Sequence, residues 1–147
     1  MKKKLLFVCT GNTCRSAMAE GICRALAKER GVPVNVASCG LAAFAGDPAS
    51  ENAIRAAEEY GADLRMHRAR PVNPWLVAEA DAIYCMTAGH RDRLCRLYPE
   101  ALDKTFLLRE DGDIPDPWGG DLETYRAAAR VIADAVERRL PEKEEER

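Results

Sequence analysis

Residues 4–16 of the chain read KLLFVCTGNTCRS. They begin an alternation of strand and helix that the rest of the sequence continues. The run 4–8 is short and apolar, with aromatic and β-branched character, which predicts a buried strand. Gly11 and Asn12 follow, and both tolerate the left-handed backbone conformation that a tight turn needs. From Arg15 the apolar residues recur at helical spacing as far as Gly31, so a helix is expected over 15–30.

The same alternation of strand and helix continues along the chain. Further strands are predicted at residues 32–38, 81–85 and 104–108, and further helices at 48–60, 74–80, 88–98 and 122–140. This order is typical of a single parallel sheet with helices on both faces. We therefore expect one α/β domain over residues 1–141, followed by a charged, disordered tail at 142–147.

Composition limits the classes of protein to consider. The chain has 147 residues and a formal net charge of −2, so neither nucleic acid nor a membrane surface is an expected partner. No apolar run could span a bilayer or serve as a signal peptide, which predicts a cytoplasmic protein, and we expect a monomer. The six cysteines contain no C-x-x-C pair, so no zinc site is expected. Four of them are interpreted as small apolar fillers: Cys23, Cys39, Cys85 and Cys95.

The loop between the first strand and the first helix has the parts of a phosphate site. Backbone N–H groups at the start of a helix attract an anion, and Arg15 can hold two phosphate oxygens through its planar guanidinium. The same field lowers the pKa of a thiol at Cys9, while Ser16 can donate a hydrogen bond to the thiolate. Cys9 could then attack phosphorus and form a phosphocysteine. The alternative is a buried cysteine before an ordinary turn.

The spacing of cysteine and arginine is not sufficient by itself. Residues 85–91, CMTAGHR, repeat that spacing after another predicted strand. This second segment has no glycine two residues after its cysteine, and Asp92 follows its arginine where Ser16 follows Arg15. A carboxylate there disfavours both a phosphate and a thiolate, so only the first segment is expected to be catalytic. The sequence contains no Gly-Lys-Ser/Thr, which argues against a nucleotide-binding P-loop.

Asp116 is the candidate proton donor to the leaving group. It stands in residues 113–120, DIPDPWGG, after the last predicted strand, and is expected at the same sheet edge as Cys9. The neighbouring Pro115 and Pro117 restrict the backbone, and Trp118 could form a wall of the site. The alternative is that Asp-Pro and Gly-Gly only make turns.

Residues 8–16, 67–70 and 116–117 together resemble the low-molecular-weight protein tyrosine phosphatase family, and the resemblance covers most of the chain. It implies a four-stranded parallel sheet with helices on both faces, a Rossmann-like arrangement, and catalysis without a metal or other cofactor. One departure is Ala17, where the family usually has proline. Alanine is compatible with the first helical turn, so the chemistry is expected to be unchanged.

The resemblance also implies roles for individual residues. Cys9 would be the nucleophile, Arg15 the phosphate clamp and Asp116 the general acid. Asn12 and Ser16 would stabilise the loop and the thiolate. His67 is interpreted as a packing residue or as one that orders the loop from beneath. The substrate-binding residues are expected to be Thr10, Gly11, Asn12, Thr13, Cys14, Ser16 and Trp118.

The substrate is predicted from the wall of the loop. Thr13 with Cys14 resembles the bacterial protein-arginine phosphatase branch, and a small, partly polar side chain leaves room for a planar guanidinium. An acidic loop near the site is complementary to such a leaving group: Glu110, Asp111, Asp113, Asp116 and Asp121. Phosphoarginine in proteins is therefore the predicted substrate. Phosphotyrosine is the alternative, since Trp118 could stack on a phenyl ring.

Three other interpretations concern the cysteines. A related branch reduces arsenate through two further cysteines, for which Cys85 and Cys95 are the candidates. Cys14 could form a disulfide with an oxidised Cys9, which would make the activity redox-regulated. The chain could instead be a binding module without catalysis. Such a module would need neither Cys9 nor Asp116, so the presence of both argues against it.

Overall fold

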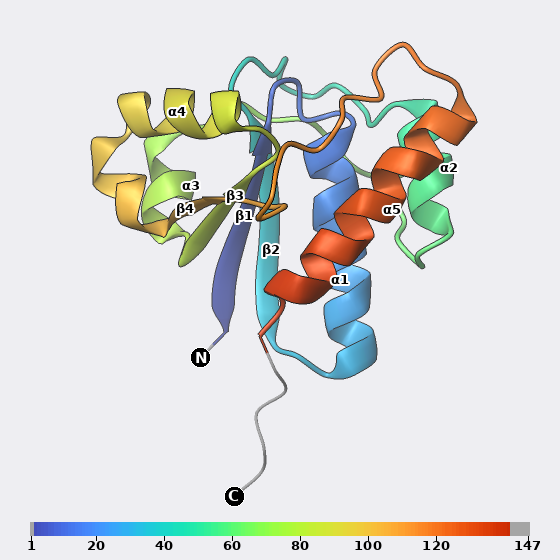
Figure 1. Ribbon diagram of the computed structural model, residues 1–147, viewed down its shortest axis with the longest axis horizontal. Coiled ribbons are helices and arrows are strands. Elements are labelled where there is room, and N and C mark those ends of the chain that lie inside the picture. The colour runs from blue at the N-terminus through green and yellow to red at the C-terminus, as the bar shows by residue number, and fades with distance from the viewer. Residues whose placement is uncertain (1, 142–147) are drawn as a thin grey trace, which may run out of the picture.

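The computed structural model describes residues 2–141, and the predicted tail at 142–147 lies outside the described residues. Its centre is a sheet of four parallel strands in the order β2-β1-β3-β4 (Figure 1). β1 (Lys3–Cys9) pairs with β2 (Val34–Gly40) on one side and with β3 (Ala82–Cys85) on the other, and β3 pairs with β4 (Thr105–Leu107). The predicted α/β fold with a four-stranded parallel sheet is confirmed.

Helices cover both faces of the sheet (Figure 1). One face carries α1 (Arg15–Arg30), α2 (Glu51–Glu58) and α5 (Leu122–Arg139), and the other carries α3 (Pro74–Glu79) and α4 (Ala88–Leu97). A 3-10 helix that the sequence did not predict, η1 (Pro99–Lys104), precedes β4. The predicted helix over 48–60 is shorter than expected. It begins after Ser50, because the Ser50 hydroxyl accepts from the N–H of Ala53 and caps α2 there.

Two hydrophobic cores follow from the alternation of side chains along β1. Leu5 and Phe7 pack toward α1 and α5, whereas Leu6 and Val8 pack on the side of α3 and α4. A central parallel strand is buried on both faces, which explains why residues 5–8 are apolar without a break.

The crevice for a ligand lies beyond the carboxyl end of β1. β1 pairs with β2 on one side and with β3 on the other, so the strand order changes direction at β1. Folds of this kind bind ligands beyond the carboxyl ends of the strands at such a point. Cys9, the last residue of β1, stands at this edge. Gly40 ends β2 beside it, and a Cβ at Gly40 would lie 2.4 Å from the carbonyl oxygen of Thr10. Only glycine therefore allows β2 to lie this close to the loop after β1.

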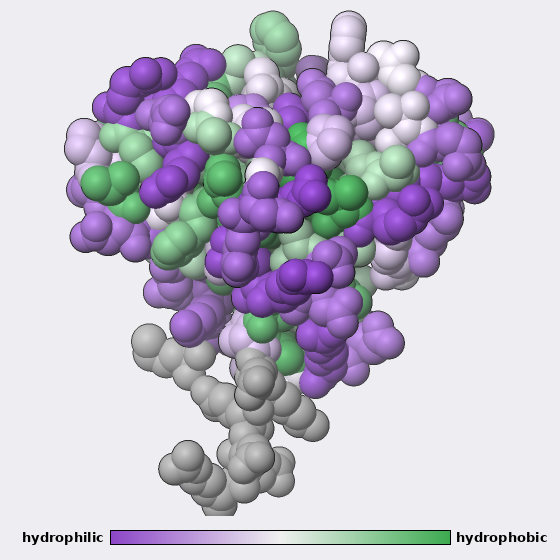
Figure 2. All heavy atoms as spheres, in the orientation of Figure 1, coloured by the Kyte–Doolittle hydropathy of each residue, from purple (hydrophilic) through white to green (hydrophobic). Residues whose placement is uncertain are grey.

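The face of the molecule that carries α5 is mostly hydrophilic, with small, separate apolar areas (Figure 2). Within residues 2–141, no helix has both the length and the apolar character needed to span a membrane. Two of the large apolar side chains that are exposed, Phe44 at 77% and Trp118 at 78%, border the pocket described next.

Candidate active site

Cys9 lies at the floor of a pocket, where β1 ends and the loop to α1 begins. The residue is only 3% exposed. Its Sγ lies 2.8 Å from the hydroxyl oxygen of Ser16 and accepts from the N–H of Asn12 at 3.3 Å. Both groups can donate to sulfur, so they favour a thiolate over a thiol.

Two opposing influences act on the pKa of the Cys9 thiol. Burial is the largest and raises it, whereas the hydroxyl and amide of Ser16, the amide of Asn12 and the charge of Arg15 lower it. The prediction of a lowered pKa counted only the stabilising groups and is corrected here: burial, which the sequence does not reveal, raises the pKa of Cys9. The extent of ionisation therefore depends on the hydrogen bonds that the loop supplies.

The start of α1 is open to an anion. Among the described residues, no side chain caps this helix, and its first turn contains no acidic residue. Apart from the amide of Ser16, which contacts the Cys9 sulfur, its first N–H groups are therefore free to bind a phosphate. Asn12 has φ 58°, the left-handed conformation predicted for this turn.

Asn12 is the centre of a network that holds the loop in shape. Its Nδ2 donates to the hydroxyl oxygens of Ser16 at 2.8 Å and Ser38 at 2.9 Å, and its Oδ1 accepts from the N–H of Arg70 at 3.0 Å. Nε2 of His67 lies 2.7 Å from the carbonyl oxygen of Asn12. His67 thus lies against the loop, as one of its two interpretations proposed. Ser38 and Arg70 were not predicted as part of the site.

Arg15 and Asp116 meet at the pocket although they are far apart in the sequence. Arg15 is 6% exposed, its Nη1 donates to the carbonyl of Ile114 at 3.0 Å, and its Nη2 lies 3.6 Å from Oδ2 of Asp116. The N–H of Ile114 donates to the carbonyl of Met86 at 2.8 Å, which ties the acidic loop to the end of β3. The Asp116 side chain is largely exposed, and its Oδ1 accepts from the N–H of Trp118 at 3.1 Å. A buried guanidinium and a solvent-accessible carboxylate therefore stand side by side.

The pocket has a volume of about 430 Å³. Its lining includes all the predicted site residues except Ser16, which lies beside the Cys9 sulfur. Three further lining residues, Ala42, Phe44 and Asp47, were not predicted. They belong to the segment after β2, which reaches the pocket because β2 pairs with β1, and no motif marks them.

The residues that form this arrangement lie within a match to a known protein family. The family described as low molecular weight phosphotyrosine protein phosphatase matches residues 4–146. The chain belongs to this family.

Similar proteins are phosphatases with two kinds of named substrate. A protein-arginine-phosphatase of Geobacillus stearothermophilus is 40% identical over 144 residues, which cover 94% of each chain. The solved structure of a low molecular weight protein tyrosine phosphatase from T. tengcongensis is 39% identical, with a TM-score of 0.89, and covers 92% of this chain and 96% of its own. A mutant of the YwlE arginine phosphatase with a phosphorylated active-site serine is 33% identical, with a TM-score of 0.87 and 90% of both chains covered. The present chain is thus a protein phosphatase.

Cys14 of this phosphatase borders the pocket, and its sulfur lies near the start of α2 and near α5. Its Sγ lies 3.5 Å from the hydroxyl oxygen of Ser50 and 3.4 Å from that of Tyr125, and Oγ1 of Thr13 is 3.7 Å from it. The sequence did not predict either Ser50 or Tyr125 at the site. Both Cys9 and Cys14 are free thiols here, so the disulfide between them stays a prediction.

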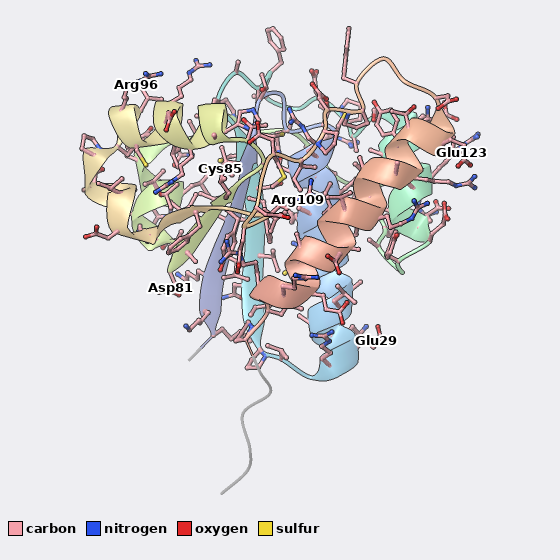
Figure 3. The ribbon with its side chains drawn as sticks, in the orientation of Figure 1. Glu29, Asp81, Cys85, Arg96, Arg109 and Glu123 are labelled. Carbon is pink, nitrogen blue, oxygen red and sulfur yellow. The ribbon has the colours of Figure 1, made fainter. Side chains whose placement is uncertain are left out.

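The other cysteines of the phosphatase lie outside the pocket lining. Burial raises the pKa of Cys23 and of Cys39 to about 12, and it also raises the pKa of Cys85. Cys85 ends β3 and packs in the core on the side of α3 and α4 (Figure 3). Cys95 is partly exposed on α4. Because neither Cys85 nor Cys95 borders the pocket of Cys9, the arsenate-reducing alternative gains no support.

Proposed function

We propose that this phosphatase hydrolyses phosphoarginine in proteins through a phosphocysteine at Cys9. The observation that carries the proposal is that two carboxylates, Asp47 and Asp116, line the pocket whose floor is Cys9. Asp116 pairs with Arg15, whereas within residues 2–141 no cation lies at ion-pair distance from Asp47. A guanidinium leaving group would supply a cation between the two carboxylates. The relatives named as arginine phosphatases support the same choice.

In the first step Cys9 attacks phosphorus as a thiolate, in line with the P–N bond, and the Ser16 hydroxyl, the Asn12 amide and the Arg15 charge stabilise this form against the effect of burial. The N–H groups at the start of α1 and the Arg15 guanidinium bind the three phosphoryl oxygens and stabilise the charge that spreads over them. The S–P bond forms as the P–N bond breaks. Asp116 enters this step in its protonated form and gives its proton to the departing nitrogen, so the arginine leaves as a guanidinium and Asp116 becomes the carboxylate that can pair with Arg15.

In the second step water attacks the phosphocysteine. Asp116, now ionised, takes one proton from the water as its oxygen bonds to phosphorus. The S–P bond breaks, and the Cys9 thiolate leaves with the Ser16 hydroxyl and the Asn12 amide beside it. Inorganic phosphate is released, and both side chains return to their starting protonation states.

Phosphotyrosine is the second candidate, and a separate observation favours it. Phe44 and Trp118 both border the pocket with exposed aromatic rings. Such rings can stack on a phenyl group, but they can equally stack on a guanidinium plane. The carboxylates distinguish the two candidates, because a neutral phenol leaving group gains nothing from Asp47.

The test compares phosphoarginine and phosphotyrosine peptides of the same sequence. Asp47→Asn should lower kcat/KM for phosphoarginine roughly tenfold and change that for phosphotyrosine by less than about twofold. Asp111→Asn is the matched control, since Asp111 pairs with Arg109 at 3.0 Å and does not line this pocket. Thr13→Ile should shift the preference toward phosphotyrosine. A wild type that prefers phosphotyrosine would overturn the substrate but leave the phosphocysteine mechanism intact.

We also propose that Cys14 protects Cys9 from irreversible oxidation. Peroxide would convert the Cys9 thiolate to a sulfenic acid, and attack by the Cys14 thiol would form the disulfide and release water. Cys14 would have to leave Ser50 and Tyr125 to do so. Dithiothreitol should restore peroxide-treated wild type, whereas Cys14→Ser should stay inactive. Equal recovery of both proteins would contradict the protective disulfide.

The cellular setting is a further proposal. The cysteines within the described residues are all free, as expected in the reducing cytoplasm. We propose that the phosphatase acts there as a monomer on phosphorylated proteins and binds neither nucleic acid nor membranes. Light scattering after size-exclusion chromatography would measure the oligomeric state.

A further inference from the structure

His90 stands behind the phosphate loop and has no part in the steps above. It lies in the first turn of α4 and is 8% exposed. Its Nε2 lies 2.8 Å from Oγ1 of Thr10, and Thr10 lines the pocket together with Cys9. The contact therefore connects α4 on one face of the sheet to the loop that would hold the substrate.

The two nitrogens of the His90 ring have different surroundings. Nδ1 is buried and has no hydrogen-bond partner among the described residues. A buried N–H without an acceptor is rarer in proteins than a buried acceptor without a donor. The proton of a neutral ring is therefore better placed on Nε2, where Thr10 can accept it.

Burial, more than the nearby charges, keeps the His90 ring neutral near pH 7. Burial and then the positive charge of Arg15 lower the pKa of His90 to about 4. Asp113 and Asp116 act in the opposite direction, and Arg93 adds to the lowering. The ring consequently carries one proton rather than two.

We propose that His90 is a positioning residue that donates from Nε2 to Oγ1 of Thr10 and thereby directs the Thr10 hydroxyl proton into the pocket. A hydroxyl that accepts from one donor still has its own proton to give. In the pocket the acceptor would be an oxygen of the bound phosphoryl group. With the opposite tautomer, Thr10 would donate to His90 and offer the substrate no proton. The inference rests on the proposed function of the Cys9 loop.

A double-mutant cycle tests this with p-nitrophenyl phosphate as substrate and inorganic phosphate as inhibitor. Thr10→Val removes a donor to the charged phosphoryl group, and His90→Leu removes the group that orients this donor. Each substitution should therefore lower kcat/KM roughly tenfold. The double variant should be no slower than Thr10→Val, since His90 acts only through the hydroxyl. His90→Gln carries an amide N–H near the position of Nε2 and should recover most of the activity. Full activity in Thr10→Val, or an equal effect of His90→Leu in both backgrounds, would overturn the inference.

Two further measurements separate positioning from a general loss of structure. Leu94→Ala removes a buried side chain one turn further along α4 and should lower Tm without changing the effect of Thr10→Val. Nitrogen-15 spectra of the wild-type imidazole should show a protonated Nε2 and a bare Nδ1, and a protonated Nδ1 would refute the assignment. The spectra need no turnover. They therefore test His90 even if Cys9→Ser retained activity and the proposed function failed.

Discussion

Residues 9–15 and 85–91 share the spacing of cysteine and arginine, and both follow adjacent strands of one sheet, yet they form different structures. α1 begins at Arg15, so residues 10–14 form an open loop around the sulfur. α4 begins at Ala88, so Arg91 already lies one turn inside the helix. The position at which the helix begins, rather than the spacing, determines whether the arginine can face a bound phosphate.

The two helix starts also differ in what binds their N–H groups. In α4, Oγ1 of Thr87 accepts from the N–H of His90 at 3.1 Å, and Oδ1 of Asp113 accepts from the N–H of Ala88 at 2.8 Å. Side-chain oxygens thus take the place of an anion. α1 has no side-chain cap within the described residues. The N–H groups of Ala88 and His90 at the start of α4 are therefore already paired, whereas α1 leaves its start open to an anion.

The largest contrast is expected between the two cysteines. Cys9→Ser should lower kcat by roughly 10³-fold or more, because the hydroxyl is a far weaker nucleophile. Cys85→Ser should leave kcat nearly unchanged but cost about 1–3 kcal/mol of unfolding free energy, because it buries a hydroxyl among apolar groups. Steady-state kinetics and urea unfolding measure the two effects. Loss of activity in a folded Cys85→Ser would break the comparison.

The arginines should differ next most strongly. Arg15→Lys should lower kcat/KM by roughly 10²-fold, since a lysine cannot hold two phosphate oxygens in one plane. Arg91 donates from Nε to the carbonyl of Thr105 at 3.2 Å, away from the pocket lining. Arg91→Lys should therefore change kcat/KM by less than about twofold. A comparable loss in both variants would mean that α4 contributes to phosphate binding directly.

A smaller effect is expected from the residues that follow the two arginines. Ser16→Ala removes the hydroxyl beside the Cys9 sulfur, so the pKa of Cys9 should rise and its alkylation at pH 7 should slow roughly three- to tenfold. Asp92 is exposed on α4, and Asp92→Ala should not change the rate. Mass spectrometry of the peptide that contains Cys9 follows the reaction against pH. An unchanged titration in Ser16→Ala would show that other donors hold the thiolate.

Most of the fold could be predicted from local pattern, because each strand and helix has its own apolar spacing. The run 5–8 predicted a buried strand, and Gly31 predicted the end of α1, where it adopts φ 68°. The helix η1 was missed, since a 3-10 helix has three residues per turn and does not show the apolar spacing of an α-helix.

The site could be predicted only where a sequence motif marks it. Cys9 and Arg15 lie in one contiguous loop before a helix, and Asp116 lies between two prolines. Phe44 and Asp47 follow β2 of the same sheet, but their own sequence has no motif, so only the pairing of β2 with β1 reveals that their loop reaches the pocket. The rise in the pKa of Cys9 was missed for a related reason: burial depends on packing from several elements at once.

The last expected effect concerns stability rather than activity and separates the second segment from the first by its response to acid. The pKa of His90 is lowered to about 4 in the folded chain, from 6.5 for a free side chain. Between these values the unfolded chain binds a proton that the folded chain does not, so the unfolding free energy should fall as the pH is lowered from 6.5 toward 4. His90→Gln removes this contribution, and the difference in unfolding free energy between wild type and variant should shrink or change sign over that window. Urea unfolding at a series of pH values measures it. A difference that stays constant with pH would mean that His90 has the same pKa in the folded and the unfolded chain, and that neither burial nor Arg15 lowers this pKa.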